Sequence, residues 1–206
     1  MSFGQHGGIK LNEVETQIAR ANEARDINLV PFYKEHSRDG NVVLLDGDSP
    51  IAKIFQRRFQ VDTLINRIRT GGVLAIQEKI RFNDRGYDDI LIEEKSYTIP
   101  HDVPGWLHKI DPCVEIVLYA SIHGDGQGAT CFPLPWPATR DWILKHKNEF
   151  HIQKAPNPIN GVYRWSHNLI VPRRRITQAL KFEGFTLREG KVVGDFWGIP
   201  HMEWIE

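Results

Sequence analysis

The segment from Val73 to Phe82 constrains the fold of this 206-residue chain more than any other feature. If the segment is a β-strand, successive side chains point to opposite faces of a sheet. One face is nearly all apolar and carries Leu74, Ile76, Glu78, Ile80 and Phe82. The opposite face carries Val73, Ala75, Gln77, Lys79 and Arg81. The first face must therefore meet a hydrophobic core, while Gln77 and Lys79 project from the other face, one pleat apart.

Helical and strand-like patterns alternate on both sides of this segment. Apolar spacing and capping signals predict helices over residues 12–26, 48–59, 104–109 and 139–150. Apolar runs bounded by turn residues predict further strands over residues 41–45, 61–65, 89–97, 114–122 and 129–134. This order predicts an α/β (α+β) domain with a mixed central sheet flanked by helices.

The chain divides into three parts by composition. Residues 1–10 are rich in Gly and predict a flexible arm, residues 11–150 form the core domain, and residues 151–206 predict a C-terminal extension of short strands and loops packed on that core. No apolar run approaches the roughly 20 residues of a membrane helix, and no secretory pattern opens the chain, so we expect a cytoplasmic protein without a membrane partner. The two cysteines are too few for a disulfide scaffold or a four-cysteine zinc site.

Three polar residues are expected to meet on the polar face of the long strand. Asp62 lies 15 residues before Gln77, on a strand that the Gly71-Gly72 turn can fold back alongside. Asp62, Gln77 and Lys79 would then lie close together. Carboxylate and amide oxygens suit Mg²⁺, which makes bound water more acidic, and a nearby lysine can offset charge on a phosphate.

These residues resemble a known signature. Asp62 followed by Gln77-Glu78-Lys79 is similar to the D…(D/E/Q)-x-K pattern of the PD-(D/E)XK nuclease superfamily, the restriction-endonuclease-like fold, and to a group of bacterial and phage-type proteins with this core. The resemblance spans roughly residues 12–150. Further segments that carry it are Phe59–Asp62, Ala75–Arg81, Asp89–Glu93, Gly105–Leu107 and Leu118–Ala120.

The resemblance implies a metal-dependent DNA endonuclease or phosphodiesterase. It implies Asp62 and Gln77 as ligands of Mg²⁺ or Mn²⁺ and Lys79 as the catalytic lysine. Glu15 would correspond to an acidic residue that some members contribute, and Glu93 could supply a further carboxylate. Many nucleases of this fold pair as dimers to cut two strands, so a homodimer is an implied assembly.

Several alternatives remain open at this point. Glu13 and Glu23 compete with Glu15, and Glu93-Glu94-Lys95 is a second E-x-K pattern downstream of Asp62. Two positions depart from the family pattern: Val61 replaces the motif proline, and Gln77 replaces an acidic ligand with a weaker, neutral one. A second hypothesis is therefore a catalytically inactive nuclease-fold module that binds nucleic acid or a protein partner, and a third is a structural phage-type protein used in assembly.

Basic residues are balanced by acidic ones across the chain. The 26 Lys and Arg equal the 26 Asp and Glu, which counts against avid, sequence-blind DNA binding but allows a local basic groove. The candidate nucleic-acid contacts are Arg57, Arg58, Arg81, Arg173, Arg174 and Arg175. Each cluster could equally be a solvated face.

Overall fold

The computed structural model describes residues 11–45, 49–82, 88–97, 101–124, 126–156, 165–181 and 184–193, with the main chain alone at 11–15, 17, 97 and 156. The expected arm, residues 1–10, lies outside this range. Within the described residues, seven strands form one sheet in the order β1-β2-β3-β6-β7-β10-β11. Their bounds are β1 Val42–Leu44, β2 Thr63–Asn66, β3 Val73–Phe82, β6 Ile116–Ile122, β7 Gly128–Pro135, β10 Phe185–Arg188 and β11 Lys191–Val193. Strands β3 and β6 are parallel and the other neighbours are antiparallel, so the sheet is mixed.

A second, antiparallel sheet of the described residues has the order β5-β4-β9-β8. Its bounds are β4 Asp89–Tyr97, β5 Val103–Pro104, β8 His151–Pro156 and β9 Trp165–Pro172. Although β4 follows β3 in the chain, it leaves the first sheet and pairs with β9. A β-bulge interrupts that pairing between Glu93 and Lys95.

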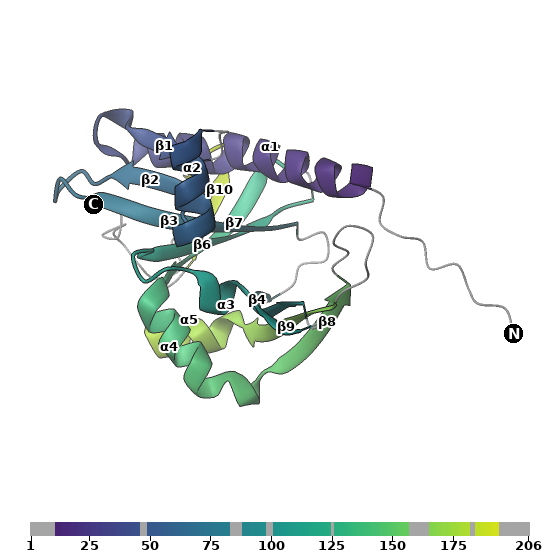
Figure 1. Ribbon diagram of the computed structural model, residues 1–206. Helices are drawn as coiled ribbons and strands as arrows, with labels where there is room; N and C mark the ends of the chain where they lie inside the picture. Colours follow the sequence, from purple (N-terminus) through teal and green to yellow (C-terminus); the bar gives the residue numbers. More distant parts are fainter. Residues whose placement is uncertain are drawn as a thin grey trace, which may run out of the picture.

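The helices cover both sides of the larger sheet (Figure 1). Their bounds are α1 Leu11–Glu35, α2 Pro50–Ile54, α3 Trp106–Lys109, α4 Trp136–His146 and α5 Arg173–Leu180. Short turns add η1 Arg38–Gly40, η3 Lys147–Glu149 and the π-helical turn η2 Phe55–Phe59, which continues α2. Helix α2 begins as the sequence predicts, because the Ser49 hydroxyl accepts a hydrogen bond from the Ala52 N–H at 3.1 Å.

Helix α1 is longer than the expected helix over residues 12–26. It runs past Pro31, which lacks the N–H for an interior helical hydrogen bond. The extra turns bury Leu29, Phe32 and Tyr33 completely, and this burial offsets the lost hydrogen bond. Tertiary packing rather than local propensity therefore sets where α1 ends.

Hydrophobic residues fill both faces of the larger sheet. One core lies between α1 and the sheet and includes Leu74, Ile76, Leu118 and Phe185. The other lies between the two sheets and helices α2 to α5; its members include Ile90, Ile92, Tyr119, Phe132, Trp136, Leu169 and Val171. Every residue of β6 is buried as a result.

The mixed α+β class expected from the sequence is confirmed, and β3 and β4 begin and end where predicted. The chain after residue 150 is more deeply integrated than an added extension. Its strands β8 and β9 build half of the second sheet, and β10 pairs with β7 in the first. Among the helices of the described residues, none is long and apolar enough to cross a membrane.

Candidate functional site

Asp62 lies directly before β2 and faces Gln77 on β3. Its backbone is fixed on both sides, since its N–H donates to the Ile76 carbonyl at 2.9 Å and its own carbonyl accepts from the Leu45 N–H at 2.8 Å. Its Oδ2 accepts a hydrogen bond from the Glu78 N–H at 2.8 Å and another from the Gln77 side-chain amide. The antiparallel register of β2 and β3 thus brings together the two residues that the sequence places 15 positions apart.

Lys79 projects from the same face of β3, two residues beyond Gln77. Its side chain is half-buried, with Nζ 5.5 Å from the centroid of the Trp106 ring on α3. Burial lowers the pKa of Lys79, while the negative charges of Asp62 and Glu93 oppose that shift. In the described part of the chain, no hydrogen bond or ion pair holds the Lys79 ammonium group.

Glu93 acts on Lys79 from the other sheet, since its negative charge raises the pKa of that lysine. It lies on β4, and its carboxylate accepts a hydrogen bond from the Ser96 hydroxyl at 3.0 Å. The adjacent turn into α3 passes so close that a Cβ at Gly105 would overlap the Glu93 carbonyl. Only glycine allows this approach, which places the ring of Trp106 beside Lys79. The site is therefore bounded by both sheets.

We refer to Asp62, Gln77, Lys79 and Glu93 as the Lys79 cluster. Burial raises the pKa of Asp62, and the Glu78 N–H, Lys79 and Arg25 act against that rise. Among the described residues, no group of three His, Cys, Asp or Glu side chains could hold a metal ion. Mg²⁺ commonly binds one or two carboxylates and keeps several waters, so Asp62 with Gln77 remains a suitable donor set once the amide turns its oxygen inward.

The remaining predicted members of the site have different surroundings. The main chain of position 15 lies in α1, but the side chain of Glu15 is outside the described residues. The lysine of the alternative pattern on β4, Lys95, forms an ion pair with Asp102, and its middle residue, Glu94, pairs with Lys147 at 3.2 Å. Its acidic residue is Glu93, whose negative charge acts on Lys79.

Sequence reasoning missed an acidic group on the opposite face of β3. Glu78 is buried against α1 and accepts a hydrogen bond from the Thr63 hydroxyl at 2.6 Å. Burial raises the pKa of Glu78 to about 7, with the Asp62 charge adding to the rise and Arg25 opposing it. The signal was present in the sequence, because Glu78 is the one charged residue on an otherwise apolar strand face.

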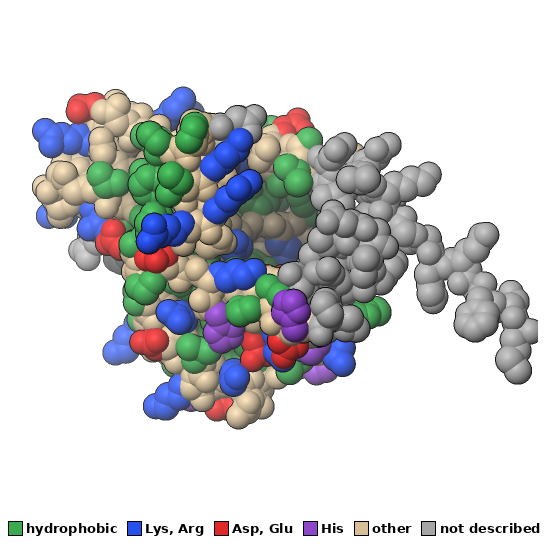
Figure 2. Space-filling model, viewed as in Figure 1, with side chains coloured by type: hydrophobic (Ala, Val, Ile, Leu, Met, Phe, Trp, Pro, Cys, Tyr) green, Lys and Arg blue, Asp and Glu red, His purple; other side chains and the backbone are tan. Residues whose placement is uncertain are grey.

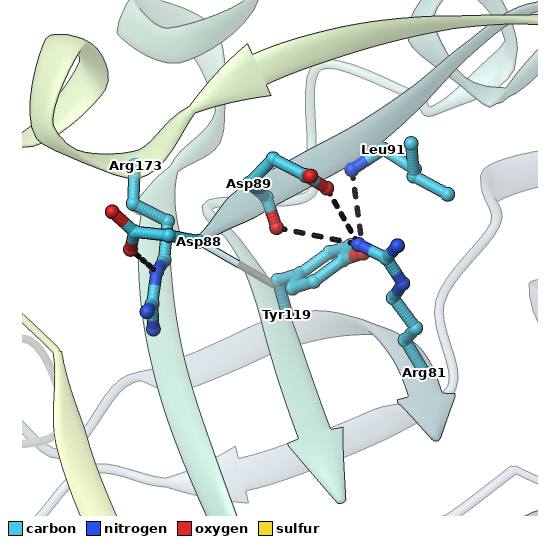
Figure 3. Close-up of polar contacts among 6 residues, drawn as sticks. All are labelled: Arg81, Asp88, Asp89, Leu91, Tyr119 and Arg173. Atoms are coloured by element: carbon cyan, nitrogen blue, oxygen red, sulfur yellow. Dashed lines mark hydrogen bonds and ion pairs between the residues drawn. The ribbon is translucent and has the colours of Figure 1, made fainter. Parts of the chain in front are cut away.

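Three of the six candidate arginines form ion pairs. Arg81 binds Asp89 at 2.6 Å, and Arg173 binds Asp88 at 2.6 Å, so the two adjacent aspartates hold one arginine each (Figure 3). Arg175 binds Glu149, also at 2.6 Å. These pairs join β3, β4 and the helices of the second layer, which gives the three arginines a structural role.

The other three arginines are exposed. Arg57 and Arg58 lie on the π-helical turn after α2, and Arg174 lies in the first turn of α5. Figure 2 shows Lys and Arg side chains beside α2 at the edge of a hollow in this face of the molecule. A basic rim therefore exists there despite the zero net charge.

Comparison of the chain with protein-family models, with curated proteins and with solved structures finds no match. The interpretation of the Lys79 cluster therefore depends on its own geometry.

Proposed function

We propose that this protein is a metal-dependent phosphodiesterase of the PD-(D/E)XK type that acts on DNA. The observation that carries the proposal is the convergence of Asp62, Gln77 and Lys79 on adjoining strands, with the negative charge of Glu93 acting on Lys79 from the second sheet. The restriction-endonuclease-like fold is part of the same proposal. Its support is the mixed sheet in which β2 and β3 bring these residues together.

Each residue of the cluster has a distinct role in this proposal. Asp62 and Gln77 would hold Mg²⁺ or Mn²⁺, which supplies positive charge to a phosphate and acidifies water when bound. Lys79 donates hydrogen bonds to the phosphate and offsets the charge that develops on its oxygens. Trp106 keeps one side of Lys79 dry, which strengthens that interaction. The negative charges of Asp62 and Glu93 favour the charged form of the Lys79 ammonium against the effect of burial.

DNA would approach along the exposed basic residues. Arg57 and Arg58 are available on the π-helical turn, and they suit contacts with phosphates rather than with bases. Cleavage of both strands by two copies of the chain is the assembly that the family resemblance implies, and sedimentation of the protein with and without a DNA duplex tests it.

A cleavage assay tests the proposal. Purified protein is incubated with supercoiled, linear and single-stranded DNA in Mg²⁺ or Mn²⁺, alongside Lys79→Met, Asp62→Asn and the control Lys145→Met, which changes an exposed lysine on α4. We expect cleavage by the native chain and the control, and about a hundredfold loss in the other two variants. Equal rates in all four proteins, or no cleavage of any substrate, would contradict the proposal.

One observation favours a second candidate, a nucleic-acid-binding module without catalysis. Oδ2 of Asp62 already accepts hydrogen bonds from the Gln77 amide and the Glu78 N–H, which is a satisfied arrangement without a metal. This candidate predicts DNA binding that falls with salt, needs no divalent cation and survives Asp62→Asn. Fluorescence anisotropy with a labelled duplex in EDTA measures it.

A further inference from the structure

A cavity of about 620 Å³ lies between α5 and strands β7 and β10, on the far side of the Asp88–Asp89 pair from Arg81. Among the described residues, its lining includes Asp88, Thr130, Phe132, Arg173, Arg174, Gln178 and Thr186. None of the four residues of the Lys79 cluster lines it. A volume of this order is typical of pockets that enclose a small organic molecule.

One end of the cavity carries two arginines and one aspartate, Arg173, Arg174 and Asp88. Arg173 is held in place by the ion pair with Asp88 and by the Phe132 ring, whose centroid lies 4.8 Å from the guanidinium carbon. Arg174 is exposed, and no ion pair within the described part of the chain involves it. Three arginines begin α5 with no acidic residue in its first turn, although the start of a helix already carries positive partial charge. Because Arg173 pairs with Asp88 and Arg175 with Glu149, an anion at this end would balance the remaining positive charge of Arg174.

Neutral hydrogen-bonding groups and apolar walls complete the lining. Thr130 on β7 and Thr186 on β10 are directly opposite each other in the antiparallel register. Gln178 lies on the exposed side of α5 and adds an amide. The apolar part of the lining is Phe132, which is otherwise buried in the core between the two sheets; Phe185 also borders the cavity, although its ring packs on Phe32 of α1 at the other face of the sheet. The cavity thus combines guanidinium groups and threonine hydroxyls with one aromatic side chain.

We infer that this cavity binds a small organic phosphate, a phosphomonoester attached to a flat, apolar group. A phosphate offers three acceptor oxygens to Arg174, to the remaining N–H groups of the Asp88-paired Arg173 and to the neighbouring hydroxyl groups, which is more than a single carboxylate offers. Inorganic phosphate alone would leave most of the cavity unfilled. This inference is independent of the proposed nuclease activity, because it uses neither the Lys79 cluster nor a metal ion.

Titration calorimetry on the full chain tests the inference with phenyl phosphate and adenosine monophosphate as probes, and with adenosine and inorganic phosphate as comparators. Two variants change the lining at exposed positions: Arg174→Gln removes a positive charge, and Gln178→Glu adds a negative one. The matched control is Ala179→Glu, which places the same charge on the next, exposed residue of α5, outside the lining.

We expect at least one of the two phosphate esters to bind with a dissociation constant below about 1 mM, and both lining variants to weaken it about tenfold. The Ala179→Glu control should change it less than about twofold. Three results would overturn the inference: no binding of either ester, equal binding of adenosine or inorganic phosphate, or the same loss in Ala179→Glu as in Gln178→Glu. Unfolding temperatures of all variants show that each is folded.

Discussion

The two faces of β3 place ionisable residues in opposite surroundings. On the face toward α1, Glu78 is enclosed by the core and hydrogen-bonded to Thr63. On the face toward the second sheet, Lys79 is half-buried, and the negative charges of Asp62 and Glu93 act on it. Burial shifts the pKa of Glu78 upward and that of Lys79 downward, so each face favours the neutral form of its own group.

The difference between the faces lies in what offsets the cost of burial. The Thr63 hydroxyl and the positive charge of Arg25 lower the pKa of Glu78 by less than burial raises it, so its carboxyl is easily protonated. Lys79 has two carboxylates near it, which favour its charged form. Lys79, a charged group balanced by opposite charges and partly exposed, can interact with a ligand. Glu78, a buried carboxyl group, can only bond to the strands and helix packed around it.

The largest effect on stability is expected where the second sheet packs against the face of β3 that carries Lys79. Gly105→Ala places a methyl group onto the Glu93 carbonyl, and the neighbouring Glu94 carbonyl carbon lies 2.8 Å away, so β4 and α3 must separate. We expect a loss of about 4 kcal/mol or more in the free energy of unfolding by urea. The control Gly72→Ala, whose nearest atom would be 3.6 Å away, should cost less than about 1 kcal/mol; an equal loss in both variants would show that the contact is unimportant.

The second-largest effect on stability is expected on the face of β3 toward α1, and it depends on pH. The pKa of Glu78 is about 7 in the folded chain against 4.5 for an ordinary glutamate, so the unfolded chain releases the proton first as pH rises. Stability of the native chain should therefore fall between about pH 4.5 and 7, by up to about 3 kcal/mol, and then level off.

Glu78→Gln should abolish that loss, because the amide oxygen still accepts from Thr63 and carries no charge. We expect the variant to match the native chain near pH 4.5 and to exceed it at pH 8 in urea unfolding followed by tryptophan fluorescence. Glu23→Gln, an exposed change on α1, should alter stability by less than about 0.5 kcal/mol at both pH values. A native chain with no such decline would contradict the buried, protonatable Glu78.

A smaller effect is expected from the opposite change, an amide replaced by a carboxyl group, on the face of β3 that carries Lys79. Gln77→Glu replaces the amide that donates to Asp62 with a second carboxyl group, which should cost about 2 kcal/mol at pH 8. If Asp62 and position 77 hold a metal, about 10 mM Mg²⁺ should recover most of this loss in thermal unfolding. A melting temperature that Mg²⁺ leaves unchanged would argue against a metal at this position.

The smallest effect is expected far from both faces. Arg175→Gln breaks the ion pair with Glu149, whose side chains remain 37% and 50% exposed. Solvent screens such a pair, so its loss should cost less than about 1 kcal/mol, and high salt should shrink the difference further. Chemical denaturation at low and high salt measures it.

Much of the fold could be predicted because local patterns decide it. The alternation in residues 73–82 predicted the bounds of β3 and its apolar face toward α1, and Ser49-Pro50 marked the start of α2. The length of α1 and the place of β4 could not be predicted in this way. The first depends on the burial of Phe32 and Tyr33, and the second on pairing with β9, about 75 residues later in the sequence.

In the candidate site, too, local sequence patterns predict some features and long-range contacts determine the others. The spacing of Asp62, Gln77 and Lys79 predicted their meeting, because a tight hairpin leaves few registers for two adjacent strands. The roles of Trp106 and Glu93 beside Lys79 arise from contacts between separate sheets, which no local spacing encodes. The ion pairs of Arg81, Arg173 and Arg175 likewise needed the spatial arrangement, since a basic cluster in sequence does not reveal its acidic partners.

The late pairing of β9 and β10 has a consequence during synthesis on the ribosome. When β4 and β7 emerge, each lacks the neighbour that will cover one of its edges, since β9 and β10 are translated tens of residues later. Two backbone edges with free N–H and carbonyl groups thus stay open in the nascent chain. A chain cut short before residue 165 would keep both edges permanently open, which makes truncated products of this protein targets for chaperones and prone to aggregate.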